Sequence, residues 1–236
     1  MTAYAIRRWL VVFKHHPSAL LLAIQLLGVL LYPAMEDTQA GRAMFGAFGI
    51  LVLSVALWVV NRSPLVNWVA WLLAMPAVVI SIFGALSGRT DLVALVHLLE
   101  GALYLYTAFG LIAYMLRDHK VSLDELFAAG ATFTLLAWAF AFSYSVCQQW
   151  YPQSFIAAVH ADQPRSWVEL LFLSFSTLSG VGLSDIIPIR PQARALVMLE
   201  QFAGVMYIAL VVSRLIGLAT VRVNANGARA DREDSR

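Results

Sequence analysis

The chain has few charged residues and a single cysteine. Of its 236 residues, 13% are charged and 61% are hydrophobic, whereas a soluble domain has about 25% charged and about 45–50% apolar residues. The charges lie in clusters between long apolar runs, a pattern that excludes a soluble globular protein and indicates a polytopic membrane protein. Cys147 has no second cysteine as a partner, so an internal disulfide framework is excluded. The net charge of +2 favours no class of partner, and no nucleic acid is expected.

The sequence also lacks the residue patterns of an enzyme. It has no phosphate-binding glycine loop, no cluster of metal ligands, and no nucleophile placed beside a base on one expected helix face. Residues 221–236 are polar and charged, which predicts a disordered cytoplasmic tail. That tail is too short for a nucleotide- or calcium-sensing domain. We therefore predict that the protein is not an enzyme and that it needs no organic cofactor.

Apolar runs organise the rest of the chain. Residues 1–16 have one apolar face and a basic end, as expected of an amphipathic helix lying in the membrane interface. Residues 17–120 are expected to form a domain of four membrane spans, and residues 121–220 a second domain with two more. The six expected spans cover residues 18–35, 41–60, 65–86, 92–116, 123–150 and 192–219, each approximately.

The basic residues predict the orientation of these spans. If the N-terminus is cytoplasmic, eleven of the sixteen lysines and arginines fall on the inner side of the membrane. The outer side then holds Arg42, Arg89, Arg165, Arg190 and Arg194. Both termini are expected to be cytoplasmic, and the connection between the last two spans is expected to face outward.

The fourth span, at residues 92–116, contains no lysine or arginine. A voltage sensor needs positive charges at every third residue there, because one charge moved across the membrane is worth only about 2.3 kcal/mol per 100 mV. Voltage gating through arginines is therefore not expected. The span does contain His97 and Glu100, which lie three residues apart on one helix face. Proton-sensitive gating is one hypothesis for them, and a neutral His97 hydrogen-bonded to Glu100 in a packed interface is the alternative.

The stretch between the fifth and sixth spans contains a short apolar segment, Trp167 to Leu178. About 12 residues are too few to cross a bilayer, so this segment is expected to enter the membrane and return. Ser166 and Glu169 have the spacing of a capping box, which predicts a helix start. Non-helical backbone at membrane depth is tolerated only in protein or beside water, so residues 180–184 predict a pore. The alternative is a surface loop on a six-helix transporter or membrane enzyme.

Residues 172–185, FLSFSTLSGVGLSD, resemble the pore helix and selectivity filter of the potassium-channel family. That family carries a threonine, two further residues and then TVGYGD. Thr177, Val181, Gly182 and Asp185 match this pattern. The resemblance extends through the last span, where Glu200 lies near the outer end and Gly204 is placed like the gating-hinge glycine of the family. Over the first four spans the chain is similar to the family in topology only.

The resemblance implies an all-α membrane protein with six transmembrane helices, a re-entrant pore helix and a filter loop. It further implies a homotetramer, in which three identical subunits and the lipid bilayer are the partners, located in a bacterial inner membrane. Glu169 and Glu200 would support the pore, and Gly204 would be the hinge. The implied filter residues are Thr177, Ser179, Gly180, Val181, Gly182, Leu183, Ser184 and Asp185. Potassium ions would bind at the carbonyls of Gly180, Val181, Gly182 and Leu183.

Three filter residues depart from the family pattern. Gly180 replaces the innermost threonine and removes its hydroxyl, Leu183 replaces the aromatic residue, and Ser184 replaces the second glycine. Ser184 is expected to occupy a left-handed backbone that costs a non-glycine residue about 1–2 kcal/mol. The departures leave two alternatives to a potassium channel: a weakly selective monovalent cation channel, and a membrane scaffold subunit that does not conduct.

Overall fold

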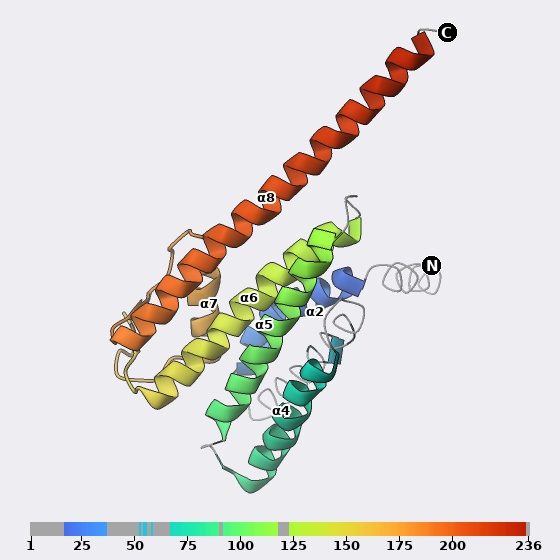
Figure 1. Ribbon diagram of the computed structural model, residues 1–236. Helices are drawn as coiled ribbons and strands as arrows, with labels where there is room; N and C mark the ends of the chain where they lie inside the picture. Colours follow the sequence, from blue (N-terminus) through green and yellow to red (C-terminus); the bar gives the residue numbers. More distant parts are fainter. Residues whose placement is uncertain are drawn as a thin grey trace, which may run out of the picture.

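The computed structural model describes residues 17–36, 52, 54, 55, 58, 67–89, 92–117 and 123–234. Within these ranges the chain forms six α-helices and one two-stranded sheet (Figure 1). The elements are α2 (Pro17–Glu36), α4 (Asn67–Ser87), α5 (Val93–Arg117), α6 (Leu123–Trp150), β1 (Phe155–Ala157), α7 (Trp167–Leu178), β2 (Ile186–Pro188) and α8 (Pro191–Asp234). The interfacial helix predicted at residues 1–16 and most of the second predicted span lie outside the described residues.

Three of these helices are long and apolar enough to cross a membrane. They are the segments Val93–Leu116 of α5, Asp124–Trp150 of α6 and Pro191–Arg214 of α8, each above the length of about 20 residues that the hydrocarbon core requires. The apolar parts of the other described helices are shorter, at Pro17–Leu31, Trp68–Gly84 and Trp167–Leu178. The predicted spans at 92–116 and 123–150 agree closely with α5 and α6.

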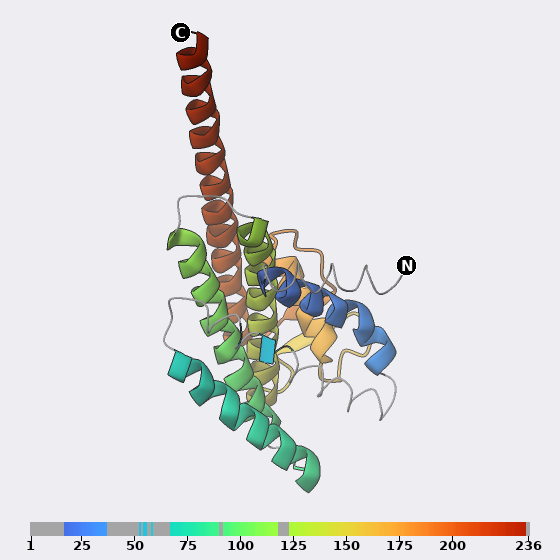
Figure 2. The same cartoon turned by 90° about the vertical axis from the view of Figure 1, so that its right-hand side faces the viewer.

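Helix α6 is the centre of the bundle. It contacts α2, α5, α7 and α8, whereas α4 packs against α5. Small buried residues along α6, among them Ala128, Ala131 and Ala139, allow the neighbouring helices to approach closely. Figure 2 shows α2 lying across the bundle at a steep angle to α8. The result is a fold in which α6 links the N-terminal helices to the segment that contains the candidate filter.

Aromatic and polar contacts hold the α6 interfaces together. Tyr104 of α5 packs against Trp138 and Phe142 of α6, with ring centroids 5.9 and 5.6 Å apart. On the α2 side, Thr134 Oγ1 donates a hydrogen bond to Gln25 Oε1 at 2.6 Å. Polar pairs of this kind satisfy groups that would otherwise be left without partners in an apolar interior.

Helix α8 is longer than the sequence predicts. It has 44 residues and ends at Asp234, well beyond the rest of the molecule (Figure 1). Residues 221–234 were expected to be disordered, but the backbone stays helical through them. They contain no proline to interrupt the helix, and several alanines and arginines that favour it. Nearer the bundle, Arg214 of α8 forms an ion pair with Glu125 of α6 at 3.2 Å.

The two short strands pair across the filter region. Strand β1 is antiparallel to β2, with Phe155 opposite Pro188, Ile156 opposite Ile187 and Ala157 opposite Ile186. The sequence predicts only a polar loop at residues 151–165, because strands of three residues are too short to show an alternating pattern. The pairing brings the start of this loop beside the segment that follows the candidate filter.

Candidate functional site

Helix α7 has the bounds that the sequence predicts, and its first turn forms the predicted capping box. Ser166 is the N-cap, with extended backbone at φ −66° and ψ 161°. Its side chain accepts a hydrogen bond from Glu169 N at 3.4 Å, and Glu169 Oε2 accepts one from Ser166 N at 2.6 Å. The reciprocal bonds satisfy two amide groups that a helix start would otherwise leave unpaired. Capping is therefore one role that the structure gives Glu169.

The segment after α7, residues 179–185, is called here the filter segment. Its first amides fold back onto the end of the helix: Gly180 N bonds Thr177 O, and Gly182 N bonds Ser176 O, both at 3.1 Å. Both glycines have a left-handed backbone, with φ +73° at Gly180 and +69° at Gly182. A Cβ atom at either position would meet no atom of the described residues within 4 Å, so the backbone conformation and not the available space requires glycine.

This geometry corrects one expectation and accounts for one departure from the family pattern. Ser184 does not have the predicted left-handed backbone, since the only non-glycine residues with positive φ among those described are Gln153 and His160. Ser184 Oγ instead accepts a hydrogen bond from Ile186 N at 3.1 Å, at the start of β2. Gly180 replaces threonine at a position that is itself left-handed, where a threonine would be strained.

The filter segment is largely uncovered by the described part of the chain. Val181 is 70% exposed and Leu183 is 72% exposed, and Gly180, Gly182 and Asp185 are also exposed. Thr177, at the end of α7, is buried. The segment therefore presents apolar side chains and backbone to its surroundings from a rigid, capped base.

Glu200 is completely buried, at 0% exposure. Its Oε2 accepts a hydrogen bond from the Tyr144 hydroxyl of α6, and its Oε1 contacts the Ser174 hydroxyl of α7. Ser174 Oγ also donates to the carbonyl of Ala137 in α6 at 2.7 Å. The carboxyl group thus joins α6, α7 and α8 at the level of the middle of α7, a position compatible with the predicted support of the pore.

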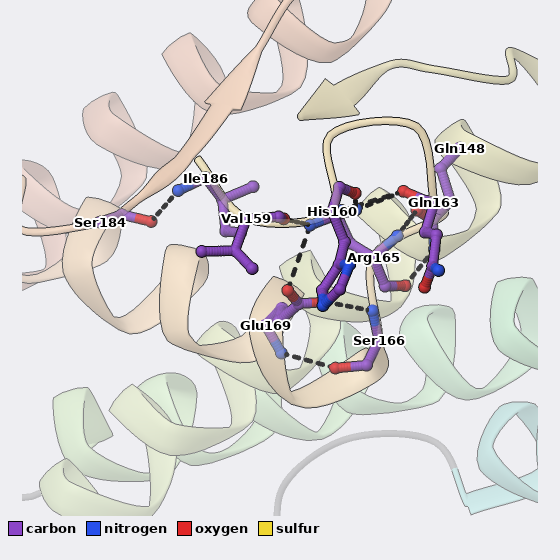
Figure 3. A network of polar contacts seen from close by, with 9 residues as sticks. All are labelled: Gln148, Val159, His160, Gln163, Arg165, Ser166, Glu169, Ser184 and Ile186. Carbon is purple, nitrogen blue, oxygen red and sulfur yellow. Dashed lines mark hydrogen bonds and ion pairs between the residues drawn. The ribbon is translucent and has the colours of Figure 1, made fainter. Parts of the chain in front are cut away.

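The N-terminal end of α7 has a second polar network that the sequence does not reveal. Arg165 is 4% exposed, and its guanidinium contacts Glu169 Oε1 at 3.3 Å together with backbone carbonyls of the preceding loop (Figure 3). Sequence alone places Arg165 on the outer side as one basic residue among five. The only local signal is its position immediately before the N-cap Ser166.

Gly204 lies where α8 crosses the end of α7. A Cβ atom at Gly204 would overlap the carbonyl oxygen of Leu178 and would lie 2.8 Å from its carbonyl carbon, which is too close for atoms that are not bonded. The structure therefore assigns Gly204 a close helix contact. Its predicted role as a gating hinge stays a prediction.

Replacing Gly204 with alanine is expected to lower the free energy of unfolding by about 1–3 kcal/mol, because the added methyl overlaps backbone that cannot rotate away. Thermal unfolding of the purified protein measures the change. The matched control is Gly84→Ala in α4, where the Cβ would be at an ordinary 3.5 Å from Arg89 O. Equal stability of the two variants would contradict the close contact.

His97 and Glu100 both lie on α5, as predicted, but His97 bonds a different partner. Its Nδ1 is 2.8 Å from Ser145 Oγ of α6, and its ring packs against Phe142 with centroids 5.2 Å apart. The hydrogen bond therefore crosses to α6, in place of the His97–Glu100 bond expected as one alternative. Proton sensing by these residues stays a prediction.

A short capped helix and a glycine-bearing segment, held between two membrane-length helices, define the pore domain of a membrane channel. A protein-family model described as ion channel matches residues 101–220, just over half of the chain, and covers α6, α7, the filter segment and most of α8. The chain belongs to this ion-channel family; it is a multi-pass membrane protein and not an enzyme, as predicted. No curated protein and no solved structure matches it.

Proposed function

We propose that the protein is a pore-forming subunit that conducts potassium ions passively. The observation that carries this proposal is the left-handed backbone at Gly180 and Gly182, two residues apart in an exposed segment. Left-handed residues at alternate positions let successive carbonyl groups turn to one side, as a ring of ion-coordinating oxygens requires. The candidate potassium ligands are the carbonyls of Gly180, Val181, Gly182 and Leu183.

The proposed assembly is a homotetramer, in which four filter segments surround one axis. Two observations support it. The exposed Val181 and Leu183 need cover that the described part of the chain does not supply, and α8 exposes large apolar residues such as Phe202, Val205 and Met206. Members of this channel family also assemble as oligomers. Six spans per subunit, cytoplasmic termini and a bacterial inner membrane complete the proposal, without gating by sensor arginines.

A weakly selective monovalent cation channel is the second candidate. It is favoured by the residues at two filter positions, since Gly180 carries no hydroxyl and Leu183 no aromatic ring. Both differences leave the carbonyl ligands in place. They remove side-chain groups that could hold the pore at a fixed width in the proposed tetramer.

The test is a recording from purified protein in planar bilayers between potassium and sodium solutions. A potassium-selective pore gives a reversal potential close to that of potassium, whereas a weakly selective pore gives one near zero. Silence under every stimulus, from protein shown to be assembled, would contradict conduction and favour a scaffold subunit.

A further inference from the structure

The loop between α6 and α7, residues 151–166, is organised around the buried side chain of Arg165. Arg165 Nη1 donates to Val159 O at 3.3 Å, Nε to Gln163 O at 3.2 Å, and Nη2 to Gln163 O at 2.5 Å and to His160 O. Figure 3 shows these carbonyls gathered around the guanidinium. A buried cation must be paired and hydrogen-bonded, and here loop carbonyls and Glu169 together satisfy it.

The backbone of Arg165 is held as firmly as its side chain. Gln148 of α6 donates from Nε2 to Arg165 O at 2.8 Å, and its Oε1 accepts from Arg165 N at 2.9 Å. These two hydrogen bonds from one side chain fix the end of the loop on α6. His160, whose carbonyl contacts the guanidinium, has a left-handed φ of +52°, a strained conformation that persists where surrounding contacts impose it.

The same loop is attached to both elements between which the filter segment lies, α7 and β2. The Arg165–Glu169 pair connects the loop to the first turn of α7. At β2, β1 pairs with the strand, and Ile189 N donates to Ser154 O at 2.9 Å. One short loop therefore holds both the start of α7 and the chain that follows the filter segment. Arg165 makes most of the hydrogen bonds within this loop.

We propose that Arg165 is a positioning residue for ion selection. By holding the loop in shape, it sets the separation of α7 and β2, and so the width of the pore that the four filter segments of the proposed tetramer would enclose. The inference rests on the proposed conduction. It depends on the planar guanidinium, whose five N–H donors diverge toward several acceptors. Lysine keeps the charge but concentrates its donors at one point, so it cannot hold the same carbonyls.

The experiment compares Arg165→Lys with wild-type protein in the potassium/sodium bilayer recording. The expected result is a fall in the potassium-to-sodium permeability ratio of about tenfold, because small displacements of coordinating carbonyls change ion preference. Gln148→Met, which removes both bonds to the Arg165 backbone, is expected to shift the ratio in the same direction. The matched control is Arg190→Lys, an exposed arginine of the same region whose Nε donates to Pro152 O; its ratio should stay within about twofold of wild type.

The outcomes separate this inference from the proposed function. Silent wild-type protein would overturn the proposed function, and with it the inference. A conducting wild type with an unchanged permeability ratio in Arg165→Lys and Gln148→Met would overturn only the positioning role. Failure of both variants to assemble would make Arg165 a folding residue and would also overturn it.

Discussion

Gly182→Ala is expected to abolish conduction. Gly182 has φ +69°, and no atom of the described residues lies within 4 Å of the position of a Cβ. Within one subunit the expected effect of alanine therefore comes from the backbone. A left-handed conformation costs a residue with a Cβ about 1–2 kcal/mol, which amounts to about 4–8 kcal/mol over four subunits of the proposed tetramer. The conducting conformation should lose a hundredfold or more of its population, roughly. Bilayer current per assembled channel is the measurement.

The chain provides a close control for this variant. Gly88, in the turn after α4, has φ +66°, and the described residues place no atom within 4 Å of a Cβ there. Gly88→Ala therefore carries a similar local backbone cost at a distance from the filter segment, and its current should match that of wild type. Normal current in Gly182→Ala would show that the filter segment does not need this backbone to conduct.

Replacing Glu200 with alanine is expected to lower the free energy of unfolding by about 2–4 kcal/mol per subunit, because it leaves a cavity and removes the carboxyl group that the Tyr144 and Ser174 hydroxyls contact. Glu200→Gln should cost less than about 1 kcal/mol. The Ser174 hydroxyl has one hydrogen to donate but lies beside two acceptors, Ala137 O and Glu200 Oε1. An N–H group in place of Glu200 Oε1 would therefore suit Ser174, which would accept from it and donate to Ala137 O. Glutamine offers an oxygen to Tyr144 and an N–H to Ser174, so every group keeps a bond.

Thermal unfolding of the purified protein compares the two variants, and Tyr144→Phe alone and with Glu200→Ala completes a double-mutant cycle. The cycle should show coupling between residues 144 and 200, since their side chains are bonded directly. A Glu200→Gln variant as unstable as Glu200→Ala would mean that the shape of the site, and not its hydrogen bonds, determines stability.

The sequence predicts α7 well because the information is local. The Ser166–Glu169 capping box and the apolar run after it determine where the helix starts and ends, and the structure confirms both ends. The backbone at Gly180 and Gly182 is likewise a property of glycine itself. The sequence is misleading at Ser184, because the family pattern transfers a left-handed backbone to a residue that here bonds Ile186 instead.

The sequence does not predict features that depend on contacts between residues far apart along the chain. The burial of Arg165 follows from carbonyls brought around it by the fold, and its bonds to Gln148 join residues on two different elements. The β1–β2 pairing crosses about thirty residues of chain and rests on only three residues in each strand. His97 meets Ser145 because α5 and α6 pack together, which no spacing within α5 could show.

The packing of Gly204 against Leu178 has a kinetic consequence. Because α8 touches the last turn of α7 there without an intervening side chain, an outward swing of α8 at this level has to carry the base of the filter segment with it. In the proposed channel, opening at the C-terminal end of α8 and rearrangement of the filter segment would then share one barrier. In single-channel recordings, the dwell times of these two events would be correlated and not independent.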